Sequence, residues 1–384
     1  MKPLTIEIHG TGTHNRGAEL MAIAIAERMR ATFPDVRLVV SSNFGDAFSR
    51  AQHQFLTTWE FPGRGRARLA GLALKFGPPG ILSTLGLVPP QEIDVVLDAS
   101  GFAFSDQWGP APALHLLEKM NGQARKRKPL ILLPQAIGSF NIPEVATVSR
   151  ELFKRAALVC ARDLQSYTMA KDVGISSDIL RRYPDFTVGI QPLQPQHLQL
   201  PDEFSVIVPN IRMMDKGLSA TGYLDFLSRS IKLLQTQGMN PVFVLHDADG
   251  DRKVIDQVCA VGNQIPVIEH SDPRVLKFIL SRATLVLGSR FHALVSSLSQ
   301  GVPCIGAGWS HKYLELFEDF ACPELLIADI TDTAALETAV DALSRLASRL
   351  DYEKKIKAAA ARIKESNEDM WQEVELLIRS STHK

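Results

Sequence analysis

Short apolar segments alternate with helical segments along the whole chain, and this alternation constrains the fold more than any other feature. The apolar segments have the length and composition of buried strands, and they form two series. These segments are 4–8, 37–41, 95–98, 130–134 and 158–161, followed by 205–208, 242–245, 267–269, 284–287 and 304–306. Strands that alternate with helices form parallel sheets covered by helices on both faces. The sequence therefore predicts an α/β protein with two doubly wound sheets.

The two series of strands are separated by a segment rich in proline and glutamine, which has neither helical nor strand periodicity. A chain of 384 residues is long enough for two domains. We expect an N-terminal domain over 1–188, a linker over 189–202, a C-terminal domain over 203–350, and a helix over 351–384 that docks back on the body. Two such domains would face each other across a cleft, with ligands at the carboxyl ends of the strands.

Charge and cysteine content exclude several classes of protein. Lysine plus arginine and aspartate plus glutamate both number 42, so no overall charge recruits nucleic acid or an anionic membrane. The four cysteines are far apart and form no Cys-x-x-Cys pair, so neither a zinc site nor a redox dithiol is expected. The chain opens directly on a strand, and no apolar run approaches the ~20 residues of a membrane-spanning helix. These features predict a soluble, cytoplasmic protein.

Residues 64–90 interrupt the alternation with a basic run beside an apolar stretch. One interpretation is an ordinary helix and loop packed on the first domain. The other is a surface that contacts lipid or a lipid-linked substrate, which would hold the protein peripherally at the inner face of a membrane.

The segment Arg290-Phe291-His292 carries the clearest chemical signal. It follows the predicted strand 284–287 and precedes a helix. The N-terminus of a helix attracts anions, because its free N–H groups and its dipole point the same way. An arginine adds a planar fork suited to phosphate or carboxylate, and a histidine can donate a proton near neutral pH. The segment predicts a site for an anionic, phosphorylated donor.

Three other polar segments follow predicted strands. The glycine-containing turn 9–19 either brings backbone amides to a ligand or is a turn capped by Asn15. Arg212 either pairs with a structural carboxylate or binds an anionic ligand. His246 is either a ligand or a structural residue, and the aspartates that follow it lack the spacing of a calcium loop.

Further polar residues fall at or just after predicted strand ends. They are Asp98, Gln135, Asp163 and Asp185. Because the carboxyl ends of parallel strands meet at one edge of a sheet, this ordered series predicts a ligand site at that edge.

Taken together, these segments resemble the polysaccharide pyruvyl transferase family over most of the chain, from His9 to about Phe320. The matching segments are Asn15-Arg16-Gly17-Ala18-Glu19, Gln135-Ala136-Ile137-Gly138, Arg162-Asp163-Leu164-Gln165-Ser166, Asp185, Arg212, Arg290-Phe291-His292, Gly301-Val302-Pro303 and Lys312. The resemblance implies two Rossmann-like domains of the glycosyltransferase-B type. It also implies transfer of pyruvate from phosphoenolpyruvate to a sugar of a polysaccharide or glycolipid precursor, with release of phosphate.

The resemblance further implies a donor site in the C-terminal domain and an acceptor site in the N-terminal domain. We expect the catalytic residues to be Arg212, Arg290 and His292, and the donor-binding residues to include His246 and Lys312 as well. The expected acceptor-side residues are Asn15, Glu19, Asp98, Gln135 and Asp163. No metal and no cofactor beyond the donor substrate are expected, because two arginines can neutralise the donor.

Forming a pyruvate ketal requires a proton at C3 of the enol and removal of protons from the attacking hydroxyls. His292 is the expected acid or a phosphate ligand, and His246 is its reserve. Asp163, Glu19 or Asp98 could deprotonate the hydroxyl.

Two other functions stay open. The first is a nucleotide-sugar glycosyltransferase, although Ser296 stands where such enzymes often carry a glutamate that binds ribose hydroxyls. The second is a non-catalytic scaffold for glycan assembly. Its cues are Ala18 in place of the family's acidic residue and Asp98-Ala99-Ser100-Gly101 in place of its triple glycine. The sequence leaves the acceptor sugar and the oligomeric state undetermined.

Overall fold

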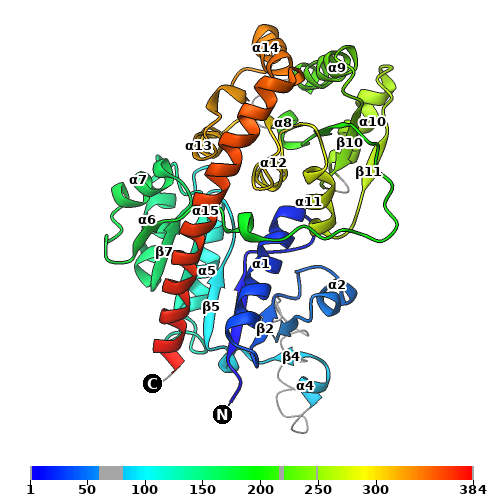
Figure 1. Cartoon of the computed structure of the whole chain (residues 1–384). Helices are drawn as coiled ribbons and strands as arrows, with labels where there is room; N and C mark the ends of the chain where they lie inside the picture. The colour runs from blue at the N-terminus through cyan, green and yellow to red at the C-terminus, as the bar shows by residue number, and fades with distance from the viewer. Residues whose placement is uncertain (1, 60–80, 216–219, 248–249, 383–384) are drawn as a thin grey trace. The chain divides into compact units, whose positions relative to one another are not determined.

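The computed structural model describes residues 2–59, 81–215, 220–247 and 250–382 (Figure 1). The chain forms two compact units. Unit 1 comprises residues 1–13, 21–184 and 368–384, and unit 2 comprises residues 14–20 and 185–367. Each unit is built on one parallel sheet, so the predicted α/β fold with two doubly wound sheets is confirmed.

In the described part of unit 1, eight strands pair in the order β4-β3-β2-β1-β5-β6-β7-β8. The strands are β1 (Thr5–His9), β2 (Arg37–Val40), β3 (Leu56–Thr58), β4 (Leu87–Val88), β5 (Val95–Asp98), β6 (Leu130–Gln135), β7 (Leu158–Ala161) and β8 (Leu180–Arg182). The helices are α1 (Arg16–Thr32), α2 (Ala47–Gln52), α4 (Ile81–Thr84), α5 (Ala111–Asn121), α6 (Pro143–Arg155) and α7 (Leu164–Asp172), with a short 3₁₀ helix η1 (Pro90–Glu92). Every residue of β5, β6 and β7 is buried, as expected for strands covered by helices on both faces.

In unit 2, the described strands pair in the order β11-β10-β9-β12-β13-β14. They are β9 (Ser205–Val208), β10 (Pro241–Leu245), β11 (Val267–Glu269), β12 (Val286–Gly288), β13 (Cys304–Ala307) and β14 (Leu326–Ile327). The helices are α8 (Arg212–Asp215), α9 (Ala220–Thr236), α10 (Gly250–Ala260), α11 (Pro273–Ser281), α12 (Phe291–Leu298), α13 (His311–Asp319) and α14 (Thr333–Ser344), with 3₁₀ helices η2 (Phe186–Gly189) and η3 (Pro323–Leu325). The strand order reverses at β9, which lies between β10 and β12. Ligands of such sheets bind outside the strand ends at this reversal.

The ten strands predicted from the sequence are all present, and four more accompany them. The additional strands β3, β4, β8 and β14 have two or three residues each. Segments of two or three residues give little periodic signal, and the sequence pattern did not mark these four.

The C-terminal helix α15 (Leu346–Thr382) is longer than the predicted helix and begins five residues earlier (Figure 1). Its first part packs Ile356 and Ile363 into the core of unit 2. Its last part belongs to unit 1, where Arg28 of α1 donates to Glu368 at 2.6 Å and to Glu375 at 2.6 Å. The helix α1 also belongs to both units, because its residues 16–20 group with unit 2.

No helix in the described ranges has the length and apolarity needed to cross a membrane. Most of the predicted lipid-contacting segment 64–90 lies outside the described residues, so that contact stays a prediction.

Candidate active site

Arg290 joins the end of β12 to the segment after β10 in unit 2. It is the N-cap residue of α12 and is 8% exposed. Its Nε donates to Asp251 Oδ2 at 2.8 Å, and its Nη2 donates to Asp251 Oδ1 and to Asp247 Oδ2. Burial works to lower the pKa of the guanidinium, but the carboxylates of Asp251 and Asp247 outweigh it and raise the pKa. Arg290 therefore stays positively charged, and its hydrogen bonds hold the segments after β10 and β12 together.

Asp251 is the centre of this arrangement. It is fully buried in the first turn of α10. Besides the Arg290 fork, its two oxygens accept from the backbone N–H groups of Ile211 at 3.0 Å and Asp247 at 3.1 Å. One carboxylate thus fixes the segments that follow β9, β10 and β12. Ala248 and Asp249 lie outside the described residues.

His292 lies in the first turn of α12, beside the start of α1. Its side chain is 11% exposed, and its Nε2 is 3.5 Å from Asp185 Oδ2. Gly17 packs directly against the ring, since a Cβ built on Gly17 would lie 2.2 Å from His292 Nδ1. Only a glycine permits this approach. The structure therefore brings the turn at 14–20 to the Arg-x-His segment within unit 2.

His246 follows β10 and is 5% exposed. Its Nδ1 is buried and makes no hydrogen bond to any described residue. Burial lowers the pKa of the imidazole well below its usual value, and the positive charges of Arg290, His292 and Arg16 lower it further. His246 is therefore neutral near pH 7, and three basic side chains lie near it.

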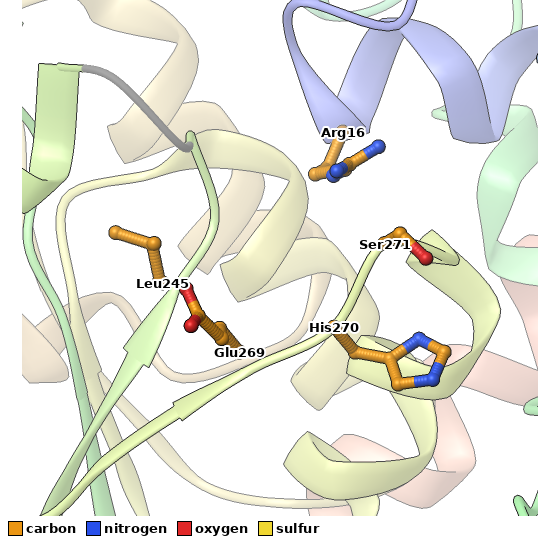
Figure 2. Close-up of a pocket in the computed structure, with 5 residues that line it drawn as sticks. All are labelled: Arg16, Leu245, Glu269, His270 and Ser271. Carbon is orange, nitrogen blue, oxygen red and sulfur yellow. The ribbon is translucent and has the colours of Figure 1, made fainter.

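Arg16 lines a cavity of about 380 Å³ together with Leu245, Glu269, His270 and Ser271. Figure 2 shows Arg16 at the start of α1 and Leu245 at the end of β10. Glu269 is the last residue of β11, and His270 and Ser271 follow it. The Arg16 Nη1 donates to Glu19 Oε2 at 2.7 Å. The volume falls within the roughly 300–1,000 Å³ typical of small-molecule sites.

The site assignments made from the sequence omitted Arg16. Its position in the sequence could have identified it, because Arg16 lies within the glycine-containing turn 9–19 and begins the helix α1.

The other two donor-side predictions lie in different settings. Arg212 is 53% exposed and pairs with Asp215 at 3.2 Å, while its backbone N–H donates to Asn210 Oδ1. Lys312 lies in the first turn of α13, where its Nζ is 5.4 Å from the Phe291 ring centroid and 5.5 Å from that of Tyr313. These are cation–π distances. The roles of Arg212 and Lys312 in binding the donor stay predictions.

The five predicted acceptor-side residues fall into two groups. Asn15 and Glu19 belong to unit 2, where Asn15 Oδ1 accepts from the Gly17 N–H at 2.9 Å and caps α1. Asp98, Gln135 and Asp163 belong to unit 1.

The three unit 1 residues differ in what they bind. Asp163 caps α7 by accepting from the Ser166 N–H at 2.7 Å. Gln135 Nε2 donates to Asp98 Oδ1 at 3.2 Å. Asp98 itself is fully buried at the end of β5, and its Oδ2 lies 2.7 Å from Nδ1 of His9. In the ranges that the structure describes, no three His, Cys, Asp or Glu side chains are placed to hold a metal ion.

Comparison with known proteins identifies relatives for this site. The family model described as polysaccharide pyruvyl transferase matches residues 15–311, which include the turn before α1 and the Arg290–His292 segment. The amylovoran biosynthesis protein AmsJ of Erwinia amylovora is 22% identical over 259 residues. That alignment covers 61% of this chain and spans 61% of the length of AmsJ.

Solved structures with the same architecture share little sequence with this chain. HepE of Anabaena in complex with UDP-glucose superposes with a TM-score of 0.60 at 14% identity, covering 97% of this chain and 99% of HepE. The UDP-GlcNAc 2-epimerase of Neisseria meningitidis, bound to UDP-GlcNAc, gives 0.58 at 13% identity, covering 99% and 100%. These similarities confirm the predicted glycosyltransferase-B-like fold.

Proposed function

We propose, from the premise that this chain belongs to the polysaccharide pyruvyl transferase family, that it transfers pyruvate from phosphoenolpyruvate to a sugar. The acceptor is a sugar of a polysaccharide or glycolipid precursor, and the products are a pyruvate ketal and phosphate. The match to AmsJ, a polysaccharide biosynthesis protein, agrees with this pathway class.

The observation that carries the proposal is the concentration of positive charge at the strand ends of unit 2. Arg290, His292 and Arg16 all lie close enough to the buried His246 to lower its pKa, so three basic side chains gather around one group. Phosphoenolpyruvate brings a phosphate and a carboxylate, which such a cluster attracts. The N-terminus of α12 adds backbone N–H groups and the positive end of a helix dipole.

Two of the three guanidinium nitrogens of Arg290 already form hydrogen bonds within the protein. Its Nε and Nη2 bind Asp251 and Asp247, while Nη1 makes no hydrogen bond to the described residues. We assign Nη1 to the donor and the other two nitrogens to the architecture of the site. Arg16 lines the neighbouring cavity and supplies a second guanidinium. Arg212 and Lys312 are assigned to the carboxylate end of the donor.

His292 is the acid in this proposal. An acid must carry a proton that it can give to C3 of the enol, and an imidazole is the side chain that carries one near neutral pH. The His292 ring is held 3.5 Å from the carboxylate of Asp185. His246 is unsuited to that role because burial keeps it neutral. A neutral imidazole can still donate one hydrogen bond to a phosphate oxygen, and this is the role assigned to His246.

The reaction balances without a further reactant. Protonation of C3 makes C2 electrophilic, and a sugar hydroxyl forms a bond to C2. The bond between C2 and the phosphate oxygen then breaks, and a second hydroxyl of the same sugar closes the ketal ring. The two hydroxyls release two protons in total. One balances the proton added to C3, and the other leaves with phosphate.

A nucleotide-sugar glycosyltransferase is the second candidate, because the similar solved structures include a complex with UDP-glucose. In such enzymes a glutamate of the corresponding helix often binds the ribose. Here the position is Ser296, which is 3% exposed within α12. A buried serine hydroxyl is neutral and shorter than a glutamate side chain, so it binds two ribose hydroxyls more weakly than a carboxylate does.

Calorimetric titration with phosphoenolpyruvate and with UDP distinguishes the two candidates. We expect phosphoenolpyruvate to bind, and Arg16→Met to weaken it by about tenfold, the effect of losing roughly 1.4 kcal/mol of charge-assisted hydrogen bonding. The matched control is Arg345→Met, which removes a guanidinium that is 66% exposed just after the end of α14, and it should bind like the unchanged protein. Binding of UDP without binding of phosphoenolpyruvate would favour the glycosyltransferase.

A further inference from the structure

The end of the central strand of unit 1 carries a histidine that the donor chemistry does not use. His9 is the last residue of β1, and Asp98 is the last residue of β5. The two strands are parallel neighbours, and their register pairs His9 with Asp98. Two strands that run side by side and end together thus deliver an imidazole and a carboxylate to the same edge. His9 Nδ1 and Asp98 Oδ2 lie 2.7 Å apart.

The carboxylate of Asp98 is buried and surrounded by its hydrogen-bond partners. It is 0% exposed. Its Oδ2 also accepts from Ser100 Oγ at 2.8 Å, and its Oδ1 accepts from Gln135 Nε2 at 3.2 Å and from the Ser100 N–H at 3.3 Å. A substrate cannot reach a carboxylate enclosed in this way. The same contacts keep the carboxylate in one orientation toward the imidazole.

The partner of the imidazole fixes its tautomer. An ionised carboxylate only accepts hydrogen bonds, so the 2.7 Å contact requires the proton to be on His9 Nδ1. In the neutral ring the lone pair is then on Nε2. That nitrogen makes no hydrogen bond to any residue described, and the side chain of His9 is 17% exposed. His9 is therefore the member of the pair that a substrate can reach.

The turn after β1 holds this geometry. Gly10 has a φ of +78°, and a Cβ at this position would lie 2.1 Å from Ser100 Oγ. Glycine at this position lets the segment after β1 close against the segment after β5. The titratable groups placed around His9 in the described part of unit 1 are Asp98 on β5 and His115 on α5, whose ring centroid lies 6.4 Å from that of His9.

The carboxylates that the sequence suggested as bases are less suited to the role. Asp98 is enclosed, as described above. Glu19 is 4% exposed and accepts from Arg16 at 2.7 Å. Asp163 is 4% exposed and caps α7. Each of these groups is already used to hold the structure, whereas one ring nitrogen of His9 is not.

We propose that His9 is the general base that removes the proton from the acceptor hydroxyl, with Asp98 as its positioning residue. This inference rests on the proposed function, because a sugar hydroxyl is the nucleophile of that reaction. As the hydroxyl oxygen bonds to C2, the O–H bond breaks and its proton moves to His9 Nε2. Asp98 stabilises the imidazolium that forms. The proton then returns to the medium or to the departing phosphate before the second hydroxyl reacts.

Kinetics of His9→Gln and Asp98→Asn test the assignment, with His197→Gln as the control. His197 is an exposed histidine of unit 2, and its loss should change kcat by less than twofold. His9→Gln should lower kcat for acceptor-dependent phosphate release by about 10²–10⁴-fold and leave the Kd for phosphoenolpyruvate unchanged. Asp98→Asn should lower kcat as well, because an amide no longer stabilises the imidazolium.

The pH profile separates a base from a structural residue. The acidic limb of the kcat/KM profile of the unchanged protein should be absent from His9→Gln. Free imidazole should restore part of the activity of His9→Gly, provided that the melting temperature shows it to be folded. A His9→Gln variant with at least half of the original kcat, or with an unchanged acidic limb, would overturn the proposal.

One measurement keeps this inference separate from the proposed function. Nitrogen-15 spectra of the histidine rings, assigned with His9→Gln, report the tautomer whether or not phosphoenolpyruvate is the donor. The proposal expects a proton on Nδ1 and none on Nε2 near neutral pH. A proton on Nε2 would overturn it. Absence of phosphate release from phosphoenolpyruvate with every acceptor would instead overturn the proposed function.

Discussion

Unit 1 and unit 2 each contain a buried aspartate that holds a basic side chain, and the two pairs differ in what they leave available. Asp251 in unit 2 binds both Nε and Nη2 of Arg290, which also binds Asp247. Asp98 in unit 1 binds one nitrogen of His9 and leaves the other without a hydrogen bond to the described residues.

The comparison shows how one motif serves two ends. A guanidinium bound through two of its nitrogens cross-links the chain, because moving it would break several charged hydrogen bonds at once. An imidazole bound through one nitrogen is oriented but still reactive. The nitrogens that already form hydrogen bonds hold the structure, and the remaining one, Nη1 of Arg290 or Nε2 of His9, is the atom assigned to the substrate.

The largest effect should come from breaking the unit 2 pair. Asp251→Asn keeps the shape of the side chain but leaves Arg290 buried without its main counter-charge. The side-chain NH₂ group of the new asparagine would also face a backbone N–H group, either that of Ile211 or that of Asp247. Two donors cannot form a hydrogen bond with each other. We expect the free energy of unfolding of the affected transition to fall by about 3–5 kcal/mol in urea denaturation.

The control for this prediction is an exposed pair of the same kind. Asp341 and Arg345 form an ion pair at 2.8 Å, with side chains 57% and 66% exposed. Asp341→Asn should cost less than about 1 kcal/mol, because solvent screens the pair. Equal losses from the two aspartate variants would mean that the Arg290 fork does not stabilise unit 2.

The second largest effect should come from displacing His292, the imidazole that we assign as the acid in unit 2. Gly17→Ala would place a methyl group 2.2 Å from His292 Nδ1, so the ring must move. Displacing a catalytic group by about 1 Å can lower activity by roughly 10²-fold. We expect phosphate release to fall by ten- to a hundredfold. Gly189→Ala is the matched control, since no atom lies within 4 Å of the new Cβ. Full activity in Gly17→Ala would remove His292 from the chemistry.

The smallest effect concerns His246, a third basic residue that is buried with one nitrogen unpaired. Burial lowers its pKa in the folded state, so the unfolded chain binds a proton more readily. Stability is therefore fully present above the unfolded pKa of about 6.5 and is lost as the pH falls below it, by up to about 1.4 kcal/mol per pH unit. His246→Gln should reduce this dependence in urea denaturation at pH 7 and pH 5.5. An unchanged slope would show that His246 is not buried as a neutral ring.

The strand ends were predictable from the sequence, and the partners across the fold were not. Alternating apolar segments located β1, β5, β9, β10 and β12, and with them the polar residues at their ends. The sequence marked Arg290 as an anion receptor because it lies between a predicted strand and a helix. It did not show that Asp251, 39 residues away, already binds part of the guanidinium. Which carboxylate fills a guanidinium depends on tertiary packing, which a strand pattern does not contain.

The His9–Asp98 pair illustrates the same limit. Both residues were visible at strand ends, but β1 and β5 are 85 or more residues apart and become neighbours only through the sheet order. The sequence also placed Asn15 and Glu19 on the acceptor side, because they follow the first strand. In the structure they group with unit 2, since the first turn of α1 packs on His292.

The most direct measurement is to follow carbon-13 phosphoenolpyruvate, labelled at C2, by NMR during incubation with the protein and a panel of sugars. This account predicts that the label moves into a sugar-bound ketal carbon while an equal amount of phosphate appears. Label that stays in phosphoenolpyruvate with every sugar, under conditions in which a UDP-sugar is consumed, would contradict it.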